Sequence, residues 1–211
     1  MPELLPLFLN LTGRQVVLVG GGRVAAAKLR QLIAVGARVR VVAPEISKDI
    51  EEAEGDLIHR AFVPSDLDDA WLVVAAATPD VNREVARAAD ERRLFVNAVD
   101  DPANASAYLS GVVRRDGVTI AISTSGDAPA LTALLREAIE RLLPHDLRTW
   151  MDTARRERVI WRRERIPIEE RKPLLLDALN DLYPPTAHQA TRAEKTVPRV
   201  PWLSAPEDSW L

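Results

Sequence analysis

Cysteine is absent from this chain of 211 residues. That absence excludes disulfide bonds, zinc sites built from thiolates and a thiol nucleophile, and it gives no reason to expect an oxidising compartment. Hydrophobic residues make up 47% of the chain and the formal net charge is −3, so a sizeable core can form without covalent staples. We therefore expect a compact cytoplasmic protein.

Long apolar runs are missing as well. No stretch approaches the ~20 residues of a membrane-spanning helix, and residues 1–9 lack the basic flank and the small-residue cleavage site of a signal peptide. We expect no membrane partner, and we expect the first residues to form an edge strand or a lid.

Histidine is scarce, with single residues at 59, 145 and 188 and no metal-ligand spacing between them. We interpret His59 as structural and predict no permanent metal site. Nucleic acid is not an expected partner, because the charge balance is acidic and no groove-reading motif is present.

What the chain does contain is a glycine turn between a strand and a helix. Residues 16–19 are an apolar run that leads into Gly20, Gly21 and Gly22, and a helical pattern follows. The first glycine permits a tight turn and the third lets the backbone approach a diphosphate, while the helix N-terminus faces the anion. The predicted diphosphate-binding turn is therefore Gly20, Gly21 and Gly22, and the small Ala25 lets the helix and the strand pack closely.

The surrounding pattern completes a strand–helix–strand unit of about thirty residues. Gly36 marks the helix end and residues 38–43 read as the second strand. The acid expected near the ribose comes late, as Glu45 behind Pro44, and two interpretations stay open: a ribose contact or a solvated loop residue. No arginine directly follows Ala43, which favours NAD over NADP, although Arg23 leaves a 2′-phosphate partner open.

Alternating strands and helices continue beyond this unit. Residues 57–62, 71–77 and 94–99 read as strands and residues 81–92 as a helix, which predicts an α/β fold with a Rossmann-like, doubly wound parallel sheet. Ligands bind beyond the carboxyl ends of such strands. Thr78 and residues 97–101, beginning with Asn97, should therefore lie at the mouth of the site.

The second half changes character. Residues 106–113 and 118–123 flank an Asp-Gly turn typical of a β-ribbon. A helix then follows, with Asp127 as a possible cap, Pro129 in its first turn and leucines on one face. A two-stranded ribbon needs a partner, and we expect a second copy of the chain, hence a homodimer.

The C-terminal part is rich in arginine between residues 145 and 172, with interleaved acids. A solvated amphipathic helix explains this best, and an arginine-lined surface for a polyanion is the alternative. The predicted regions are a Rossmann domain (1–105), a dimerisation ribbon and helix (106–143), a helical region (144–182) and an extended tail (183–211) containing Trp202 and Trp210.

Six segments, at residues 19–25, 41–45, 76–78, 97–102, 122–130 and 134–137, occur in an order and spacing that resemble the precorrin-2 dehydrogenase / sirohydrochlorin ferrochelatase family of siroheme biosynthesis. The resemblance covers about residues 1–150. It implies oxidation of precorrin-2, a tetrapyrrole, to sirohydrochlorin with NAD as cofactor. Some members of that family also insert ferrous iron, which would make iron a substrate.

The resemblance also implies residue roles. Gly20 to Val24, Pro44 and Glu45 match cofactor-binding segments, and Asp100 matches the aspartate implicated in both chemistries. A carboxylate near the macrocycle can accept a proton. As alternatives, Asp100 is a turn residue before Pro102, and Asp101 is its adjacent competitor.

A hydroxyl cluster before the last predicted helix of this region matches the border of the tetrapyrrole pocket in the resembled family. It comprises Ser123, Thr124 and Ser125. Turn hydroxyls that cap the helix beginning near Ala128 are an equal alternative.

Two other functions stay open. One is a regulatory subunit that senses NAD without chemistry. The other is a generic NAD(P) oxidoreductase acting on a small alcohol, which is disfavoured because no Tyr-x-x-x-Lys pair and no His–Asp proton relay is visible.

Overall fold

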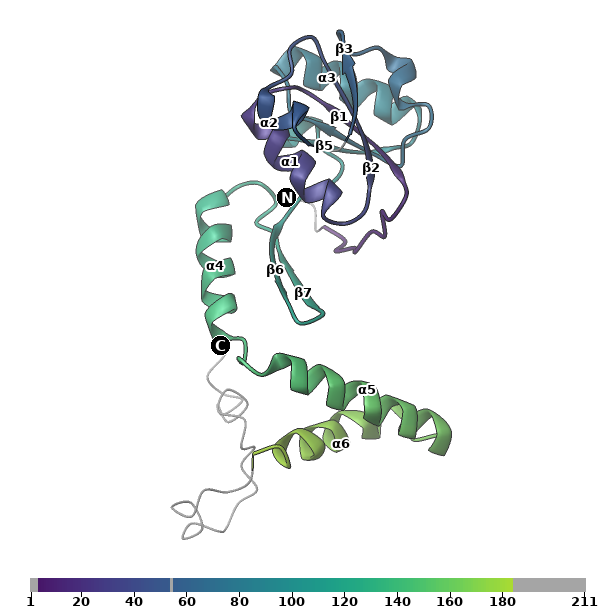
Figure 1. Cartoon of the computed structure of the whole chain (residues 1–211), viewed down its shortest axis with the longest axis vertical. Helices are drawn as coiled ribbons and strands as arrows, with labels where there is room; N and C mark the ends of the chain where they lie inside the picture. The colour runs from purple at the N-terminus through teal and green to yellow at the C-terminus, as the bar shows by residue number, and fades with distance from the viewer. Residues whose placement is uncertain (1–3, 54, 184–211) are drawn as a thin grey trace. The chain divides into compact units, whose positions relative to one another are not determined.

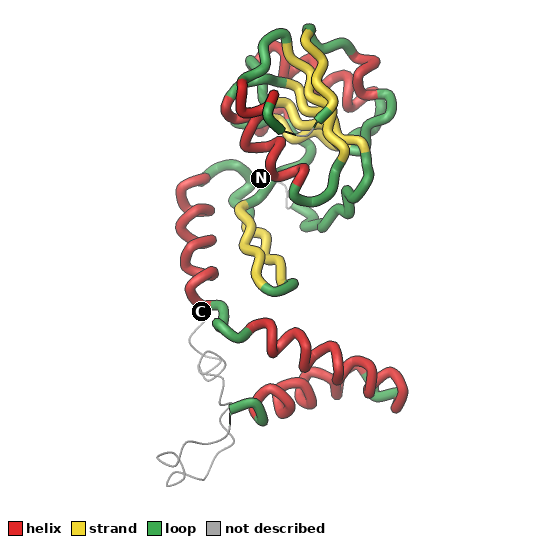
Figure 2. Tube along the Cα trace, viewed as in Figure 1, coloured by secondary structure: helices red, strands yellow, loops and turns green. Residues whose placement is uncertain are grey.

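The computed structural model describes residues 4–53 and 55–183, which divide into two compact units (Figures 1 and 2). The first unit contains the residues up to Gly111 together with Ala121–Arg136. The second contains Val112–Ile120 and the residues from Glu137 onward. Trp202 and Trp210 of the predicted tail lie outside the described residues.

A five-stranded parallel sheet forms the centre of the first unit, with strand order β3-β2-β1-β4-β5. Most inner-strand residues are apolar, as expected for strands buried on both faces, and Val16 to Leu18 have no exposed surface. The order and direction confirm the Rossmann-like parallel sheet predicted from the sequence. The strands are β1 (Gln15–Val19), β2 (Arg38–Ala43), β3 (Asp56–His59), β4 (Leu72–Ala75) and β5 (Phe95–Ala98).

Helices cover both faces of this sheet (Figure 1). On one face, α1 (Arg23–Ile33) packs Ala25, Ala26 and Leu29 against β1, β2 and β4, next to the short α2 (Lys48–Glu51). On the other face, α3 (Pro79–Glu91) and the 3-10 turn η1 (Pro64–Leu67) enclose the second half of the core. A parallel sheet with a layer of helices on each face is the doubly wound fold.

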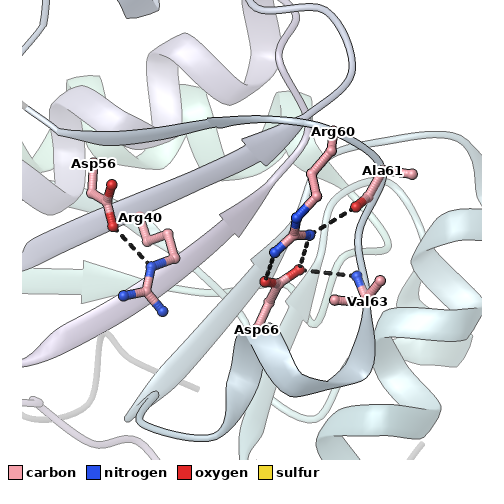
Figure 3. Close-up of polar contacts among 6 residues, drawn as sticks. All are labelled: Arg40, Asp56, Arg60, Ala61, Val63 and Asp66. Carbon is pink, nitrogen blue, oxygen red and sulfur yellow. Dashed lines mark hydrogen bonds and ion pairs between the residues drawn. The ribbon is translucent and has the colours of Figure 1, made fainter.

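The third strand is shorter than the predicted 57–62, because Arg60 leaves the ladder for an ion pair (Figure 3). Its guanidinium donates to both carboxylate oxygens of Asp66, at 2.8 and 2.5 Å, and to the carbonyl of Ala61. Asp66 is buried and also accepts the Val63 N–H at 2.9 Å. The hydrogen bonds from Arg60 lower the pKa of Asp66.

Of the two alternatives predicted for the N-terminal segment, an edge strand or a lid, the described residues 4–10 do not form the edge strand. Residues 4–10 contain no strand, and the large side chains of Leu5, Leu7 and Phe8 are exposed. The chain first enters the core at Leu11. That part of the prediction is wrong, because these residues make no ladder to the sheet.

A β-ribbon follows the sheet, formed by β6 (Gly111–Arg115) and β7 (Val118–Ile122). Asp116 and Gly117 both have positive φ, 48° and 87°, which is the signature of the tight turn predicted for Asp-Gly. The first ribbon strand begins at Gly111 and not at residue 106. The reason is that the Ser106 and Ala107 N–H groups donate to the carbonyl of Val96 in β5.

Three helices complete the described chain: α4 (Pro129–Leu142), α5 (Leu147–Glu164) and α6 (Ile168–Asn180). In the second unit, Trp150 donates its indole N–H to the Tyr183 hydroxyl at 2.6 Å, and that hydroxyl bonds Asp146. Burial raises the pKa of Tyr183. These contacts join the end of α6 to the start of α5. No helix among the described residues is both long and apolar enough to cross a membrane.

Candidate active site

The glycine turn lies at the point where the strand order reverses, between β1 and β4. Gly20 adopts φ +127°, and a Cβ at this position would stand 2.2 Å from the carbonyl oxygen of Ala76 after β4. Only glycine permits this conformation and this approach. The loops after β1 and β4 therefore meet at the crevice where doubly wound sheets bind ligands.

Gly21 fixes the loop that follows β2. A Cβ here would lie 1.8 Å from the carbonyl oxygen of Glu45, and the Ser47 N–H donates to the Gly21 carbonyl at 2.9 Å. Pro44 and Glu45 are exposed beside the glycine turn. The residues that the sequence singled out after β2 thus lie at the crevice.

Gly22 has a different role from its two neighbours. A Cβ built on it meets no atom within 4 Å, so the space beside it is open. It is the N-cap of α1 and provides no side-chain cap, so the first N–H groups of the helix lack a side-chain partner there. Arg23 and Val24 follow it, both exposed. An open backbone cradle at a helix N-terminus fits a dinucleotide diphosphate.

The loop after β4 is held by a residue that sequence analysis did not single out. Asn82 is 3% exposed, and its side-chain oxygen accepts the Ala77 N–H at 3.1 Å. Thr78 occupies the N-cap position of α3, makes no side-chain cap hydrogen bond and is exposed. The sequence signal that could have identified Asn82 is an asparagine between the apolar positions Val81 and Val85 of a predicted helix.

A cavity of about 270 Å³ lies beyond the carboxyl end of β5, and every residue that lines it belongs to the first unit. It is close to the lower end of the size range of small-molecule sites. The lining residues are Lys28, Asn97, Ala98, Val99, Asp100, Asp101, Pro102, Tyr108, Leu109, Ser110, Gly111, Ile122, Ser123, Thr124, Gly126, Pro129 and Thr132.

The two adjacent aspartates of this cavity have different surroundings. Asp101 is half-buried, and its carboxylate accepts a hydrogen bond from Asn104 at 2.8 Å in the short turn η2 (Pro102–Asn104). Asp100 is exposed and makes no hydrogen bond or ion pair with any described residue. It also has φ +56°, a left-handed conformation that aspartate tolerates better than most residues. The carboxylate of Asp100 is therefore available to a ligand.

Asn97 lies in this cavity and not at the glycine turn. It is 7% exposed, and its amide donates to the carbonyl of Ala107 at 2.9 Å. Its side-chain oxygen is buried and finds no partner among the described residues. A buried acceptor without a partner is unfavourable, so this oxygen is a candidate ligand contact.

The hydroxyl cluster before α4 is partly engaged within its own loop. Thr124 accepts the Ala128 N–H at 3.2 Å and shares a hydrogen bond of 2.9 Å with Thr132, so its hydroxyl is engaged at the start of α4. Ser123 accepts the Ser125 N–H at 3.1 Å. The side chains of Ser123 and Thr124 line the cavity, whereas Ser125 is not among its lining residues.

Lys28 is the further residue that sequence reasoning missed. It comes from α1 and lines the same cavity as Asp100. Burial lowers the pKa of Lys28, and the charge of Asp100 opposes that shift. His59 and His145 are exposed, and the described residues contain no group of three or more side chains suited to a metal ion.

Fold and glycine turn together define a Rossmann-type NAD(P)-binding protein. Residues 7–111 match the family described as "Putative NAD(P)-binding", and residues 115–142 match the family described as "Sirohaem biosynthesis protein central". The first match covers the dinucleotide-binding domain, and the second covers the end of β6, strand β7 and helix α4.

Named relatives agree with the family matches. Siroheme synthase 2 of Aeromonas salmonicida is 44% identical over 148 residues, which cover 69% of this chain and 31% of that protein. Siroheme synthase of Photorhabdus laumondii is 41% identical over 164 residues, covering 74% and 35%. Over the aligned residues the chain is similar to siroheme synthases, and it spans about a third of the length of these relatives.

A solved structure has the same fold. The structure named SirC, precorrin-2 dehydrogenase, superposes with a TM-score of 0.65 at 24% identity, covering 89% of this chain and 96% of that one. The likeness confirms the arrangement of a parallel sheet, a ribbon and C-terminal helices.

Proposed function

We propose that this chain oxidises precorrin-2 to sirohydrochlorin with NAD as the oxidant. The observation that carries the proposal is the unengaged carboxylate of Asp100, in a cavity beyond β5 and in the same unit as the glycine turn. Relatives named siroheme synthase and a structure named precorrin-2 dehydrogenase support this choice of substrate.

The cofactor would lie across the crevice between β1 and β4. The backbone of Gly20 to Val24 would hold the diphosphate, because the space beside Gly22 is open and the helix N-terminus favours an anion. Pro44 and Glu45 would border the cofactor on the β2 side, where Glu45 approaches Gly21, and Thr78 would border it on the β4 side. Asn97, in the cavity beyond β5, would offer its buried oxygen to the far end of the cofactor. When bound, NAD accepts a hydride from the substrate.

The chemical task of the chain's own residues is to hold the macrocycle and to move a proton. Oxidation removes two hydrogens, one as the hydride and one as a proton, and Asp100 would take the proton on a carboxylate oxygen. Ser123 and Thr124 would border the macrocycle, and Ser125 would support them through its N–H bond to the Ser123 hydroxyl. Asp101 would keep the loop in shape through Asn104.

Ferrous iron insertion is the second candidate activity, and the same carboxylate favours it. Two pyrrole N–H protons must leave as iron enters, and Asp100 lacks a partner of its own among the described residues. Iron would then be a substrate in transit.

The proposed working form is a homodimer in the cytoplasm. Helix α4 buries none of its residues within the described chain, and its leucines at 131, 134, 135 and 142 are 39–70% exposed. A second copy that covers this face would remove apolar surface from water. A tetrapyrrole also exceeds the cavity, so a partner copy would enclose the rest of it.

The direct experiment incubates the purified protein with precorrin-2, with and without NAD, and then adds ferrous iron while absorption spectra are recorded. Sirohydrochlorin that forms only with NAD supports the oxidation. A further change on adding iron, faster than without protein, supports chelation. NAD binding without turnover would favour the regulatory alternative, and turnover of small alcohols would favour the generic oxidoreductase.

A further inference from the structure

Lys28 occupies an unusual position on α1. The helix packs Ala25, Leu29 and Leu32 on the sheet and keeps Arg23 and Arg30 exposed. Lys28 lies at the border of these two faces and is half-buried. Arg30, two residues further on, reaches solvent and pairs loosely with Asp49 at 3.9 Å. The helix thus turns one of its cations toward the interior of the unit.

The ammonium group of Lys28 has no partner to compensate for its burial. It forms no hydrogen bond and no ion pair within 4 Å with any residue the structure describes. Desolvation therefore lowers the pKa of Lys28, and only the more distant charge of Asp100 acts against this. A partly buried charge without a partner is unfavourable. Such a group is well suited to bind an anion that enters the cavity.

The composition of the cavity indicates which anion. Its lining includes two carboxylates, Asp100 and Asp101, and Lys28 is the single cation among its lining residues. The substrate of the proposed function carries several carboxylate side chains, which the two aspartates repel. A cation in the same cavity gives a substrate carboxylate one favourable place and orients the macrocycle.

The diphosphate of a dinucleotide is a poor candidate for this anion. Lys28 is the sixth residue of α1, six positions beyond Gly22. At 1.5 Å per residue, it lies about 9 Å along the helix axis from the end that faces a diphosphate. It lines the cavity beyond β5 instead.

We propose that Lys28 binds a carboxylate side chain of the tetrapyrrole substrate and thereby holds one edge of the macrocycle beside Asp100. This inference rests on the proposed function for the identity of the substrate. It assigns Lys28 to substrate binding, and it leaves proton transfer to Asp100.

The test compares Lys28→Met, Lys28→Arg and Arg30→Met in the full chain. Lys28→Met keeps an unbranched side chain and removes the charge, so we expect the KM for precorrin-2 to rise roughly ten- to a hundredfold, the range for one charge-assisted contact. The kcat and the affinity for NAD should stay within about twofold of the wild type. Lys28→Arg should recover most of the lost affinity, and Arg30→Met should match the wild type.

A binding measurement without NAD keeps the two proposals separable. Sirohydrochlorin is titrated into each variant and followed by quenching of tryptophan fluorescence, with circular dichroism to confirm folding. Weaker binding to Lys28→Met alone supports the inference even if the wild type shows no turnover, an outcome that would reject only the proposed reaction. Unchanged binding and KM, a fall in kcat alone, or a loss of NAD affinity would each overturn it.

Discussion

Asp66 is a single carboxylate on which the end of β3 and the turn η1 both depend (Figure 3). Asp66→Asn removes the charge from a buried hydrogen-bonded pair, so we expect the free energy of unfolding at neutral pH to fall by about 2 kcal/mol. Asp56→Asn is the matched control, because its pair with Arg40 is 2.9 Å long but Asp56 is 60% exposed. That substitution should cost less than about 1 kcal/mol in urea denaturation.

The contribution of Asp66 depends on pH in a defined direction. Folding lowers the pKa of Asp66, so the unfolded chain takes up the proton first as the solution is acidified. The stabilisation is complete above the unfolded pKa of about 4 and is lost as the pH falls through the folded pKa. The difference between wild type and Asp66→Asn should therefore shrink below about pH 4. A constant difference would contradict this origin.

Among the elements of the fold, the β1–α1 turn contains two adjacent glycines whose replacement by alanine should have opposite effects on stability and on NAD binding. Gly21→Ala forces a Cβ onto the carbonyl of Glu45, so we expect a lower melting temperature. Gly22→Ala places its methyl group in open space at φ −86°, a conformation that alanine adopts, so stability should be retained. The methyl group would occupy the space proposed for the diphosphate, so we expect NAD affinity to fall at least tenfold. Thermal denaturation and NAD titration of both variants check this. Retained NAD affinity in Gly22→Ala would contradict the diphosphate site.

The bounds of the strands show how much of the fold could be predicted from the sequence. The strand 38–43 was predicted with its observed bounds, because Gly36 and Pro44 mark both of its ends. The strand predicted over 57–62 ends early because Arg60 pairs with Asp66, and the ribbon begins late because Ser106 and Ala107 bond Val96. These causes are contacts between segments, which local periodicity does not encode.

The residues of the candidate site could likewise be predicted only in part from the sequence. Position at the end of a strand singled out Asn97 and Asp100, and the family resemblance singled out Ser123 and Thr124. All four residues line one cavity. Lys28 was missed because the rotation of α1 on the sheet decides which of its cations turns inward. The roles of all these cavity residues in binding and catalysis stay predictions.

At the scale of the whole molecule, the exposed apolar face of α4 predicts self-association. The wild type should sediment at twice the chain mass of 23.4 kDa. Leu134→Glu places a charge in that face, where the leucine is 63% exposed, and should give a monomer. The control is Ile168→Glu on α6, an equally apolar residue that is 78% exposed, which should leave the dimer intact. A monomeric wild type would contradict the proposed assembly.

In the proposed reaction, Asp100 performs the proton transfer and its neighbour Asp101 does not. The most direct measurement of this difference is the rate of NAD-dependent sirohydrochlorin formation by Asp100→Asn and Asp101→Asn. Asparagine tolerates the left-handed backbone of residue 100, so both variants should fold and bind NAD. We expect Asp100→Asn to lose at least a hundredfold in kcat, the lower range for a general base, and Asp101→Asn to stay within about tenfold of the wild type. Full activity in Asp100→Asn, or the larger loss in Asp101→Asn, would contradict this role of Asp100.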